Sequence, residues 1–375
     1  MSEITLLKPV TRYSELDSLR GLAALSVFFG HSISSLAITP YFLQIIGITP
    51  LRIFFDAGAA VIFFFLLSGF VLTLPFTKED NTQIPLFAFY IKRVFRLYPA
   101  YIFAISFSLF LKYFFHHDDV LSFSENIKQY WAWNFKDLSL KEVVNTYLLI
   151  GPSFNADFID AVVWSLVVEM KISFLLPFFI IIVKRTNLIF NITFLIVLLY
   201  AFNYQYLGIF YIGVILAKYR KRLTEIVGKM HKSQVIILLI ISVLLYTARF
   251  TLNMIKSQNI MVSYTIPTYI IAIASSIMII TVLSKTRLHT LFRKGLFSFF
   301  GNISYSFYLL HWPILLFILS LISNRFSYNF MFIFFSTLGI TCLISYGVYK
   351  YIEVPFQKLA IIIIKRFPEI GLIKL

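Results

Sequence analysis

The chain has 375 residues, of which 59% are hydrophobic and only 13% are charged. These fractions lie outside those of soluble domains and predict an all-α polytopic membrane protein. The formal net charge is +16, but the basic residues are scattered between apolar runs, which argues against a nucleic-acid-binding protein. The single cysteine, Cys342, lies in an apolar run. It excludes an intramolecular disulfide framework and is expected to pack as a small core residue.

The chain is expected to form a single membrane domain over residues 1–375, with no appended soluble domain. No Gly/Ser-rich linker interrupts it, and its longest polar interval covers residues 116–145. The first 19 residues mix acidic and basic side chains, and the apolar run that follows lacks a small-residue cleavage site. We therefore expect the first span to be retained.

The first helix is predicted to run from about Ser14 to Ile38, because Ser14 and Asp17 have the spacing of a capping box just before the apolar run. Further runs of spanning length predict a total of about ten transmembrane helices. These runs lie near residues 57–76, 97–114, 161–183, 187–203, 206–218, 234–250, 264–283, 297–322 and 330–352.

The orientation follows from the basic residues of the connecting segments. If the N-terminus is cytoplasmic, 24 of the 33 Lys and Arg residues lie in inner segments and 8 in outer ones, with Lys171 inside a span. Cytoplasmic segments carry an excess of Lys and Arg. The bias predicts an even number of spans with both termini cytoplasmic.

The first apolar run contains an arginine near its start, Arg20, and a histidine deep inside, His31. Eleven residues are close to three helical turns, so both lie on nearly the same helix face, about 16 Å apart along the axis. A charged side chain near the bilayer centre costs about 2.5–3.5 kcal/mol on insertion scales, so such residues usually have a function. His31 is the predicted catalytic residue, although a packing role is the alternative.

Two further arginines, Arg93 and Arg96, precede the third apolar run and share a helix face. Because spans one and three both run outward, these arginines and Arg20 are expected at the same cytoplasmic surface. If Pro99 lies in the first turn of the span, the positive end of the helix would add to an anion site suited to phosphates. Ordinary positive-inside anchoring explains the same arginines equally well.

The fourth span contains an intramembrane glutamate, Glu169, one turn after Ser165. Such a glutamate indicates a site, although pairing with Lys171 would make it structural. Together with Trp164, these residues are candidates to bind or orient an acceptor. Aromatic residues upstream are expected to form an interfacial belt more readily than to stack on a sugar. They include Trp131 and Trp133.

A second intramembrane histidine, His311, stands beside Trp312 and Pro313. Because the proline frees backbone carbonyls, a structural hydrogen-bonding role for His311 is at least as plausible as a catalytic one. The remaining histidines are expected in loops. They are His116 and His117 in an outer loop, and His231 and His289 in inner loops.

Five sequence motifs follow one another along the chain. They are LDSLRG with its distant histidine, FFLLSGFVL, KRVFRLYP, WSLVVE and ISYSFYLLHWP. From Asp17 to about Phe356 the chain resembles the acyltransferase family 3 of bacterial membrane proteins, which includes O-acetyltransferases of surface polysaccharides. The resemblance implies a ten-span enzyme of the bacterial inner membrane. It would move an acyl group, expected to be acetyl, from cytoplasmic acyl-CoA to a hydroxyl of O-antigen, capsule or exopolysaccharide.

The motifs of the family assign roles by position. They place the family's Arg-x10-His pair on Arg20 and His31, its Arg-x-x-Arg pair on Arg93 and Arg96, and its fourth-span glutamate on Glu169. The chain departs from the family where Ser18 replaces a common Gly, and where Met170 and Lys171 replace Glu and Gln. Residues given supporting roles are Asp17, Tyr305 and His311.

The predicted mechanism uses the three arginines to hold the phosphates of acyl-CoA, the co-substrate, while its pantetheine arm runs toward His31. His31 would act as a general base or carry the acyl group itself, and Glu169 would orient His31 or bind the acceptor. No metal is expected. A proton-coupled transporter with His31, Glu169 and His311 as a relay is the rival, although no inverted repeat is evident. A non-catalytic scaffold explains neither the arginines nor the histidine.

Overall fold

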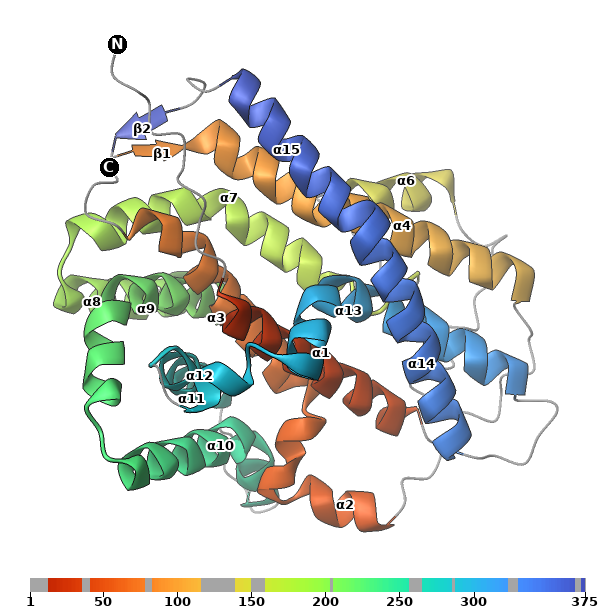
Figure 1. The fold of residues 1–375 in the computed structure, drawn as a ribbon, viewed down its shortest axis with the longest axis horizontal. Coiled ribbons are helices and arrows are strands. Elements are labelled where there is room, and N and C mark those ends of the chain that lie inside the picture. Colours follow the sequence, from red (N-terminus) through yellow and green to blue (C-terminus); the bar gives the residue numbers. More distant parts are fainter. Residues whose placement is uncertain are drawn as a thin grey trace.

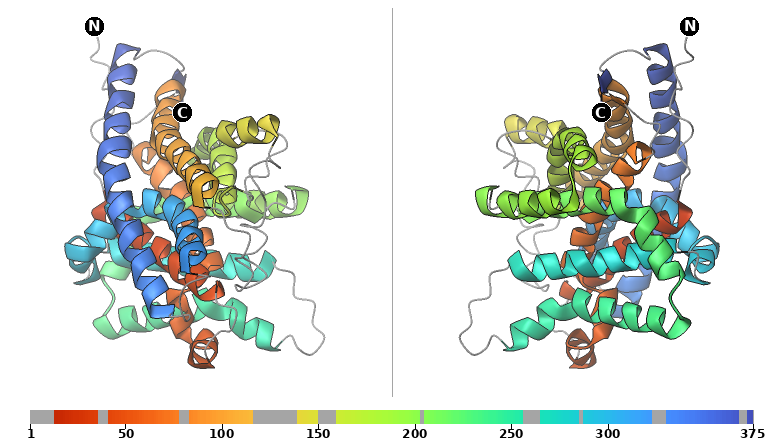
Figure 2. Two further views of the ribbon diagram at one scale, coloured as in Figure 1. Left: turned by 90° about the vertical axis from the view of Figure 1, so that its right-hand side faces the viewer. Right: turned by 90° about the vertical axis from the view of Figure 1, so that its left-hand side faces the viewer.

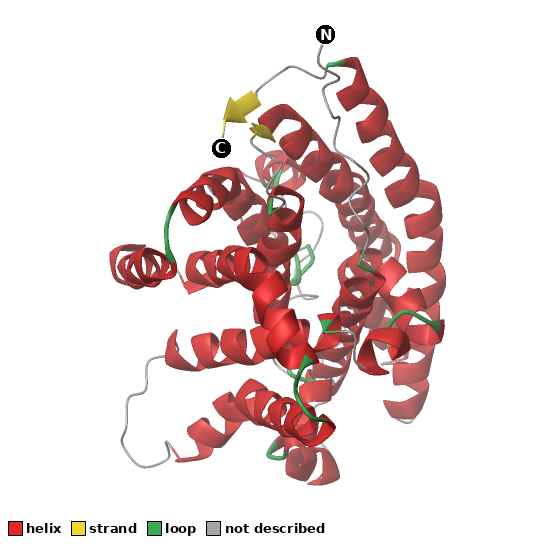
Figure 3. Cartoon of the chain, turned by 60° about the vertical axis from the view of Figure 1, so that its left-hand side comes forward, coloured by secondary structure: helices red, strands yellow, loops and turns green. Residues whose placement is uncertain are grey.

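The computed structural model describes residues 13–35, 41–77, 83–115, 139–149, 159–202, 205–255, 265–284, 287–322, 330–367 and 372–374. Over these residues the chain is almost entirely helical (Figure 3). The apolar composition explains this, because a helix satisfies its backbone hydrogen bonds within one segment where no water is present. Two short strands, β1 (Gln83–Pro85) and β2 (Leu372–Lys374), pair antiparallel. They join the segment before α4 to the C-terminal segment.

Figure 1 labels the helices in chain order. They are α1 (Ser14–Ser34), α2 (Tyr41–Gly47), α3 (Ala57–Thr73), α4 (Leu86–Phe115), α6 (Leu140–Leu148), α7 (Trp164–Arg185), α8 (Leu188–Phe202), α9 (Gln205–Gly228), α10 (Lys232–Ile255), α11 (Thr265–Leu283), α12 (Arg287–Leu291), α13 (Gly295–Ile322), α14 (Phe330–Val348) and α15 (Val354–Arg366). Shorter helical turns are two 3-10 turns, Pro50–Phe54 and Leu74–Phe76, and a π turn, Tyr349–Glu353.

Each apolar run predicted from the sequence corresponds to a helix. Within the described residues, seven helical segments are long and apolar enough to cross a membrane. They confirm a multi-pass helical membrane protein, whereas the total of ten spans and the cytoplasmic position of both termini stay predictions. Helix α9 continues well past residue 218, the end of the predicted apolar run. Its basic residues from Lys218 to Arg222 are part of the helix.

Helices α1 and α13 form the centre of the bundle and run parallel, because Gly21 meets Phe300 and Gly301 while His31 meets His311. A Cβ built on Gly21 would lie 2.5 Å from the backbone carbon of Phe300. Only glycine permits this approach, so the Gly21 and Gly301 pair brings the two backbones into contact. Of the most apolar 18-residue stretch of α13, 89% is buried inside the protein, which confirms the central position of this helix.

The outer helices present apolar side chains where lipid would lie. In α10, only 17% of the most apolar 18-residue stretch is buried inside the protein. Helices α14 and α15 join through the π turn into one helical segment from Phe330 to Arg366, and Figure 2 shows this long segment along one side of the molecule. Helix α15 packs on α4. The protein therefore has a tight α1–α13 centre within a looser shell.

Two local predictions were wrong. Helix α1 begins at Ser14 as expected, but its N-cap is Tyr13, no side chain caps it, and the carboxylate of Asp17 pairs with Arg20. The third span begins at Leu86, so Pro99 lies inside α4 instead of in its first turn. Arg93 and Arg96 are therefore about two turns or more from the positive end of the helix, whose field falls off within the first turn.

Candidate active site

The structure brings together the three arginines that the sequence indicated. Arg20 projects from α1, and its charge interacts with those of Arg93 and Arg96 from α4. Nη1 of Arg20 lies 3.0 Å from Oδ1 of Asp17, and both side chains are partly exposed. Arg96 makes no hydrogen bond or ion pair with the described residues. Three guanidinium groups on α1 and α4, two helices that both pack on α13, can bind a polyphosphate with forked hydrogen bonds.

Glu169 of α7 lies at this arginine end of the bundle. It forms a short ion pair with Arg93, which is 5% exposed, and it accepts a hydrogen bond of 2.7 Å from Ser68. Nε of Arg93 also donates to Oγ of Ser173 at 2.9 Å. Lys171 is exposed and does not form the predicted alternative pair with Glu169. Arg93 is thus fixed by two partners, and Glu169 compensates its charge.

A further carboxylate at this end, almost fully buried, was missed in the sequence. Glu353 closes the π turn between α14 and α15, is 3% exposed, and accepts a hydrogen bond from Ser306 of α13. Its charge interacts with Arg96 and Arg20. The sequence offered one signal for it, a glutamate within an apolar run followed closely by a proline, Pro355. The structure adds another, because π turns often accompany functional sites.

The opposite end of the α1–α13 pair holds the two intramembrane histidines. Nδ1 of His31 lies 3.0 Å from Nε2 of His311, and the rings are nearly parallel. His311 is fully buried, and its Nδ1 lies 2.7 Å from the carbonyl oxygen of Tyr308. The indole of Trp312 contacts the ring of His31 edge-on, with centroids 4.9 Å apart. His31 therefore has both a hydrogen-bond partner and an aromatic wall.

The acceptors fix the direction of these hydrogen bonds. A carbonyl oxygen can only accept, so Nδ1 of His311 carries the proton and donates to Tyr308. Nε2 of neutral His311 is then an acceptor, and it receives the hydrogen bond from Nδ1–H of His31. In neutral His31 the free lone pair consequently lies on Nε2, the nitrogen that His311 does not contact. This is the nitrogen that can take a proton from a substrate or attack an acyl group.

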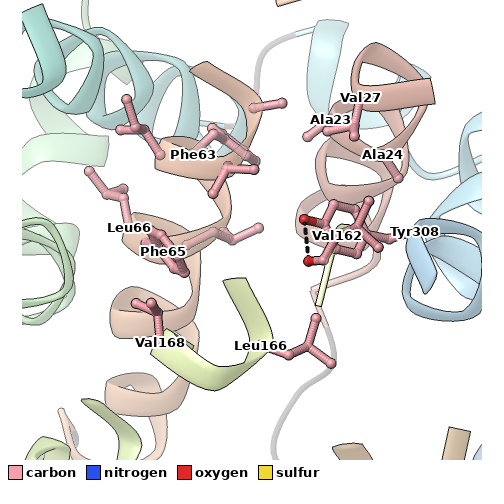
Figure 4. Close-up of a cluster of buried hydrophobic side chains, with 14 of the residues drawn as sticks. Ala23, Ala24, Val27, Phe63, Phe65, Leu66, Val162, Leu166, Val168 and Tyr308 are labelled. Carbon is pink, nitrogen blue, oxygen red and sulfur yellow. Dashed lines mark hydrogen bonds between the residues drawn. The ribbon is translucent and has the colours of Figure 1, made fainter. Parts of the chain in front are cut away.

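Tyr308 links the histidine end to α7. Its hydroxyl donates to the carbonyl oxygen of Val162 at 3.2 Å and lies 2.8 Å from Oγ of Ser165. Figure 4 shows Tyr308 with this hydroxyl toward Val162, opposite Phe63 and Phe65 of α3. Ser165 thus lies close to the histidine pair through Tyr308, while Glu169, one turn later on α7, lies with the arginines.

Two other predicted site residues lie away from the histidines. The indole of Trp164 packs against both Phe65 of α3 and Tyr206 of α9. The hydroxyl of Tyr305 donates to the carbonyl oxygen of Leu97 at 2.8 Å, one residue after Arg96. Trp164 therefore packs in the core, and Tyr305 ties α13 to the arginine-bearing turn of α4.

Several predicted features lie outside the described residues. They are His116, His117, Trp131 and Trp133. Of the histidines predicted in loops, His289 lies in the short helix α12 and pairs with Glu15, and Nδ1 of His231 lies 3.0 Å from Oγ of Ser233. No three histidine, cysteine or carboxylate side chains gather as metal ligands would in the part of the chain that the structure describes.

The comparisons with known proteins identify a family but not the roles of single residues. Residues 13–350 match the family model of acyltransferase family 3, described as an acyltransferase domain. The match begins at the N-cap of α1 and ends in the π turn, so it includes the three arginines, both histidines and Glu169. No significant match was found among curated proteins or among solved structures.

Proposed function

Because the chain belongs to acyltransferase family 3, we propose that this membrane acyltransferase moves an acyl group, with acetyl as the first candidate, from cytoplasmic acyl-CoA to a hydroxyl of a cell-surface carbohydrate. One observation carries the proposal. A cluster of three arginines and a hydrogen-bonded histidine pair lie at opposite ends of the same helix pair. Eleven residues of α1 separate Arg20 from His31, or about 16 Å.

The arginine end is suited to the donor. Coenzyme A carries several phosphate charges, and guanidinium groups bind phosphate with two parallel hydrogen bonds. Arg93 is already held by Glu169 and Ser173, so Arg20 and Arg96 are the groups that would contact phosphate most directly. Arg93 would then position the cluster. The pantetheine arm would run along α1 and present the thioester to His31.

The histidine end is suited to acyl transfer. Nε2 of His31 would accept the proton of the acceptor hydroxyl, and the oxygen would attack the thioester carbonyl carbon. The carbon–sulfur bond then breaks, and the thiolate of coenzyme A leaves and takes a proton back from His31. His311 would hold the ring of His31 in the tautomer that leaves Nε2 free. His311 is thus a positioning residue in this mechanism.

A covalent route uses the same nitrogen. Nε2 of His31 would attack the thioester carbonyl carbon, the carbon–sulfur bond would break, and the thiolate of coenzyme A would leave with a proton from His31. The resulting acyl-imidazole would pass its acyl group to the acceptor hydroxyl, whose proton would return to His31. The two routes differ when the acceptor is absent. A covalent intermediate predicts a burst of free coenzyme A equal to the enzyme concentration, whereas direct transfer predicts none.

The rival transporter needs a proton relay that includes Glu169. In the structure Glu169 is bound to Arg93 and Ser68 at the arginine end. Nδ1 of His311 donates to the carbonyl oxygen of Tyr308, which cannot pass a proton onward. The contacts of both residues therefore favour a transferase over a relay.

The proposal is tested with purified protein in proteoliposomes supplied with acetyl-CoA, and with mass spectrometry of the surface polysaccharide from cells with and without the protein. We expect thiol release that depends on an acceptor, together with an acyl-sized mass difference on the polysaccharide. Intact acetyl-CoA in the presence of the carbohydrate, with unchanged polysaccharide mass, would contradict the proposal.

A further inference from the structure

A second group of charges lies beside the histidine end and has no part in the mechanism above. Arg249 of α10 forms an ion pair of 3.0 Å with Asp56, the N-cap of α3. The charge of Arg52 interacts with both of them. Asp56 is almost fully buried, whereas Arg249 is 32% exposed. The carboxylate of Asp56 thus interacts with two guanidinium groups.

These charges lie next to the turn of α1 that bears His31. A Cβ built on Gly30, the residue before His31, would lie 2.7 Å from the carbonyl oxygen of Phe55 and 3.2 Å from Cβ of Ala57. Asp56 stands between those two residues in the chain. The Oγ of Ser26 also donates to the carbonyl oxygen of Ile53 at 3.0 Å. The segment that bears Arg52 and Asp56 therefore packs directly on α1 at the histidine end.

The guanidinium groups are held in defined positions. Arg52 lies over the ring of Phe55, 5.1 Å from its centroid. Arg249 lies over Gly58, where a Cβ would be 2.6 Å from its Nη1. If the N-terminus is cytoplasmic, as predicted, these arginines lie at the outer end of the bundle, where the positive-inside bias does not account for them.

We propose that Arg52, Arg249 and Asp56 form the acceptor subsite, and that the acceptor is an acidic sugar carrying both a carboxylate and free hydroxyls. This inference rests on the proposed function. The guanidinium groups would bind the carboxylate with forked hydrogen bonds. Oδ2 of Asp56 is buried and accepts no hydrogen bond from the described residues. A rearrangement of this segment on binding would let that oxygen accept a sugar hydroxyl.

The test compares an oligosaccharide of uronic acids with the same oligosaccharide after reduction of its carboxyl groups. Binding is measured without acyl-CoA on purified protein in nanodiscs. We expect wild-type protein to bind the acidic form about tenfold more tightly or better, since a charged hydrogen bond is lost with the reduced form. Equal binding of the two forms by wild-type protein would overturn the proposal.

Two variants locate the effect. Arg52→Gln should lose most of the preference for the acidic form while keeping the buried Asp56–Arg249 pair. Gly58→Ala keeps every charge but displaces the guanidinium of Arg249, and it should lower the preference by a smaller factor. The matched control is Arg222→Gln, on the exposed face of α9, which should change nothing. An unchanged preference in Arg52→Gln would show that these arginines only tie α10 to α3.

Thiol release from acetyl-CoA separates this inference from the proposed function. Protein that binds the acidic sugar selectively but never consumes acetyl-CoA would contradict the proposed function and leave the subsite supported. Protein that consumes acetyl-CoA with the acidic and the reduced acceptor at equal rates would support the function and overturn the subsite.

Discussion

The two ends of the α1–α13 pair hold polar groups in opposite ways. At the arginine end, opposite charges compensate one another. Asp17 pairs with Arg20, and Glu169 pairs with Arg93. The charge of Glu353 interacts with that of Arg96. At the histidine end, a chain of hydrogen bonds from His31 to His311 to the Tyr308 carbonyl needs no ion pair. The first arrangement is suited to an anionic ligand, and the second to proton transfer. We expect binding and chemistry to be separable by mutation.

The largest effect is expected at the histidine end. His31→Ala should lower acyl transfer by about 10²–10⁴-fold, because it removes the general base or nucleophile. Membrane insertion should be close to wild type, and the unfolding temperature should fall only slightly, since His31 is partly exposed but its loss leaves Nε2 of His311 without a donor. The measurement is the rate of thiol release with acceptor present. His231→Ala, in an exposed turn, is the control, and near-normal turnover in His31→Ala would remove His31 from the mechanism.

A smaller effect, on donor binding, is expected at the arginine end. Arg96→Lys keeps the charge but loses the planar fork, and the Michaelis constant for acyl-CoA should rise about 10- to 100-fold with little change in kcat. Arg20→Lys should behave similarly. The measurement is initial rate against acyl-CoA concentration in membranes of verified topology.

The double variant Arg93→Lys with Arg96→Lys tests the alternative role of these arginines. It should keep normal orientation, because two positive charges remain for the positive-inside bias. Arg222→Lys, on an exposed face of α9, is the matched control. An unchanged Michaelis constant in the double variant would mean that these arginines only anchor α4. The donor site would then have to be sought in the basic segment between Lys218 and Lys232.

His311 should show an intermediate effect. His311→Ala leaves Nδ1–H of His31 without its acceptor and opens a cavity, so we expect a partial loss of kcat, about tenfold, together with a lower unfolding temperature. His311→Gln offers an amide oxygen to His31 and should recover part of the rate. The Michaelis constant for acyl-CoA should not move in either variant. A loss as complete as in His31→Ala, in well-folded protein, would show that His311 reacts directly.

The smallest effect is expected for Ser68→Ala, which removes one hydrogen bond to Glu169. A neutral donor to a charged acceptor contributes about 1.5–3 kcal/mol when buried, but Arg93 keeps Glu169 paired, so we expect only a few-fold rise in the Michaelis constant. Ser276→Ala is the control, because that hydroxyl bonds to its own helix at Ala272. A selective loss of kcat in Ser68→Ala would place Glu169 in the chemistry.

The sequence predicted those parts of the molecule that depend on local pattern. Apolar runs of spanning length gave the helices, and the period of 3.6 residues placed Arg20 and His31 on one face of α1. Arg93 and Arg96 were expected at the same surface as Arg20 from the direction of the spans, and in the structure their charges interact with that of Arg20. These inferences need only composition, spacing and the direction of the chain.

The remainder depended on contacts between distant parts of the chain. His31 and His311 are 280 residues apart in the sequence, so their hydrogen bond and the tautomer that it sets could not be predicted. The role of Glu353 depends on a π turn that brings it to Ser306. Pro99 was misplaced because a proline inside a membrane helix can be tolerated when neighbouring groups satisfy the freed carbonyl.

Equilibrium binding of radiolabelled acetyl-CoA to purified protein, without any acceptor, tests the division between the two ends most directly. The account predicts that His31→Ala binds acetyl-CoA within about twofold of wild type although it does not turn over, while Arg96→Lys binds at least tenfold more weakly. Lost binding in His31→Ala, or wild-type affinity in Arg96→Lys, would contradict the assignment of donor binding to the arginine end and of chemistry to the histidine end.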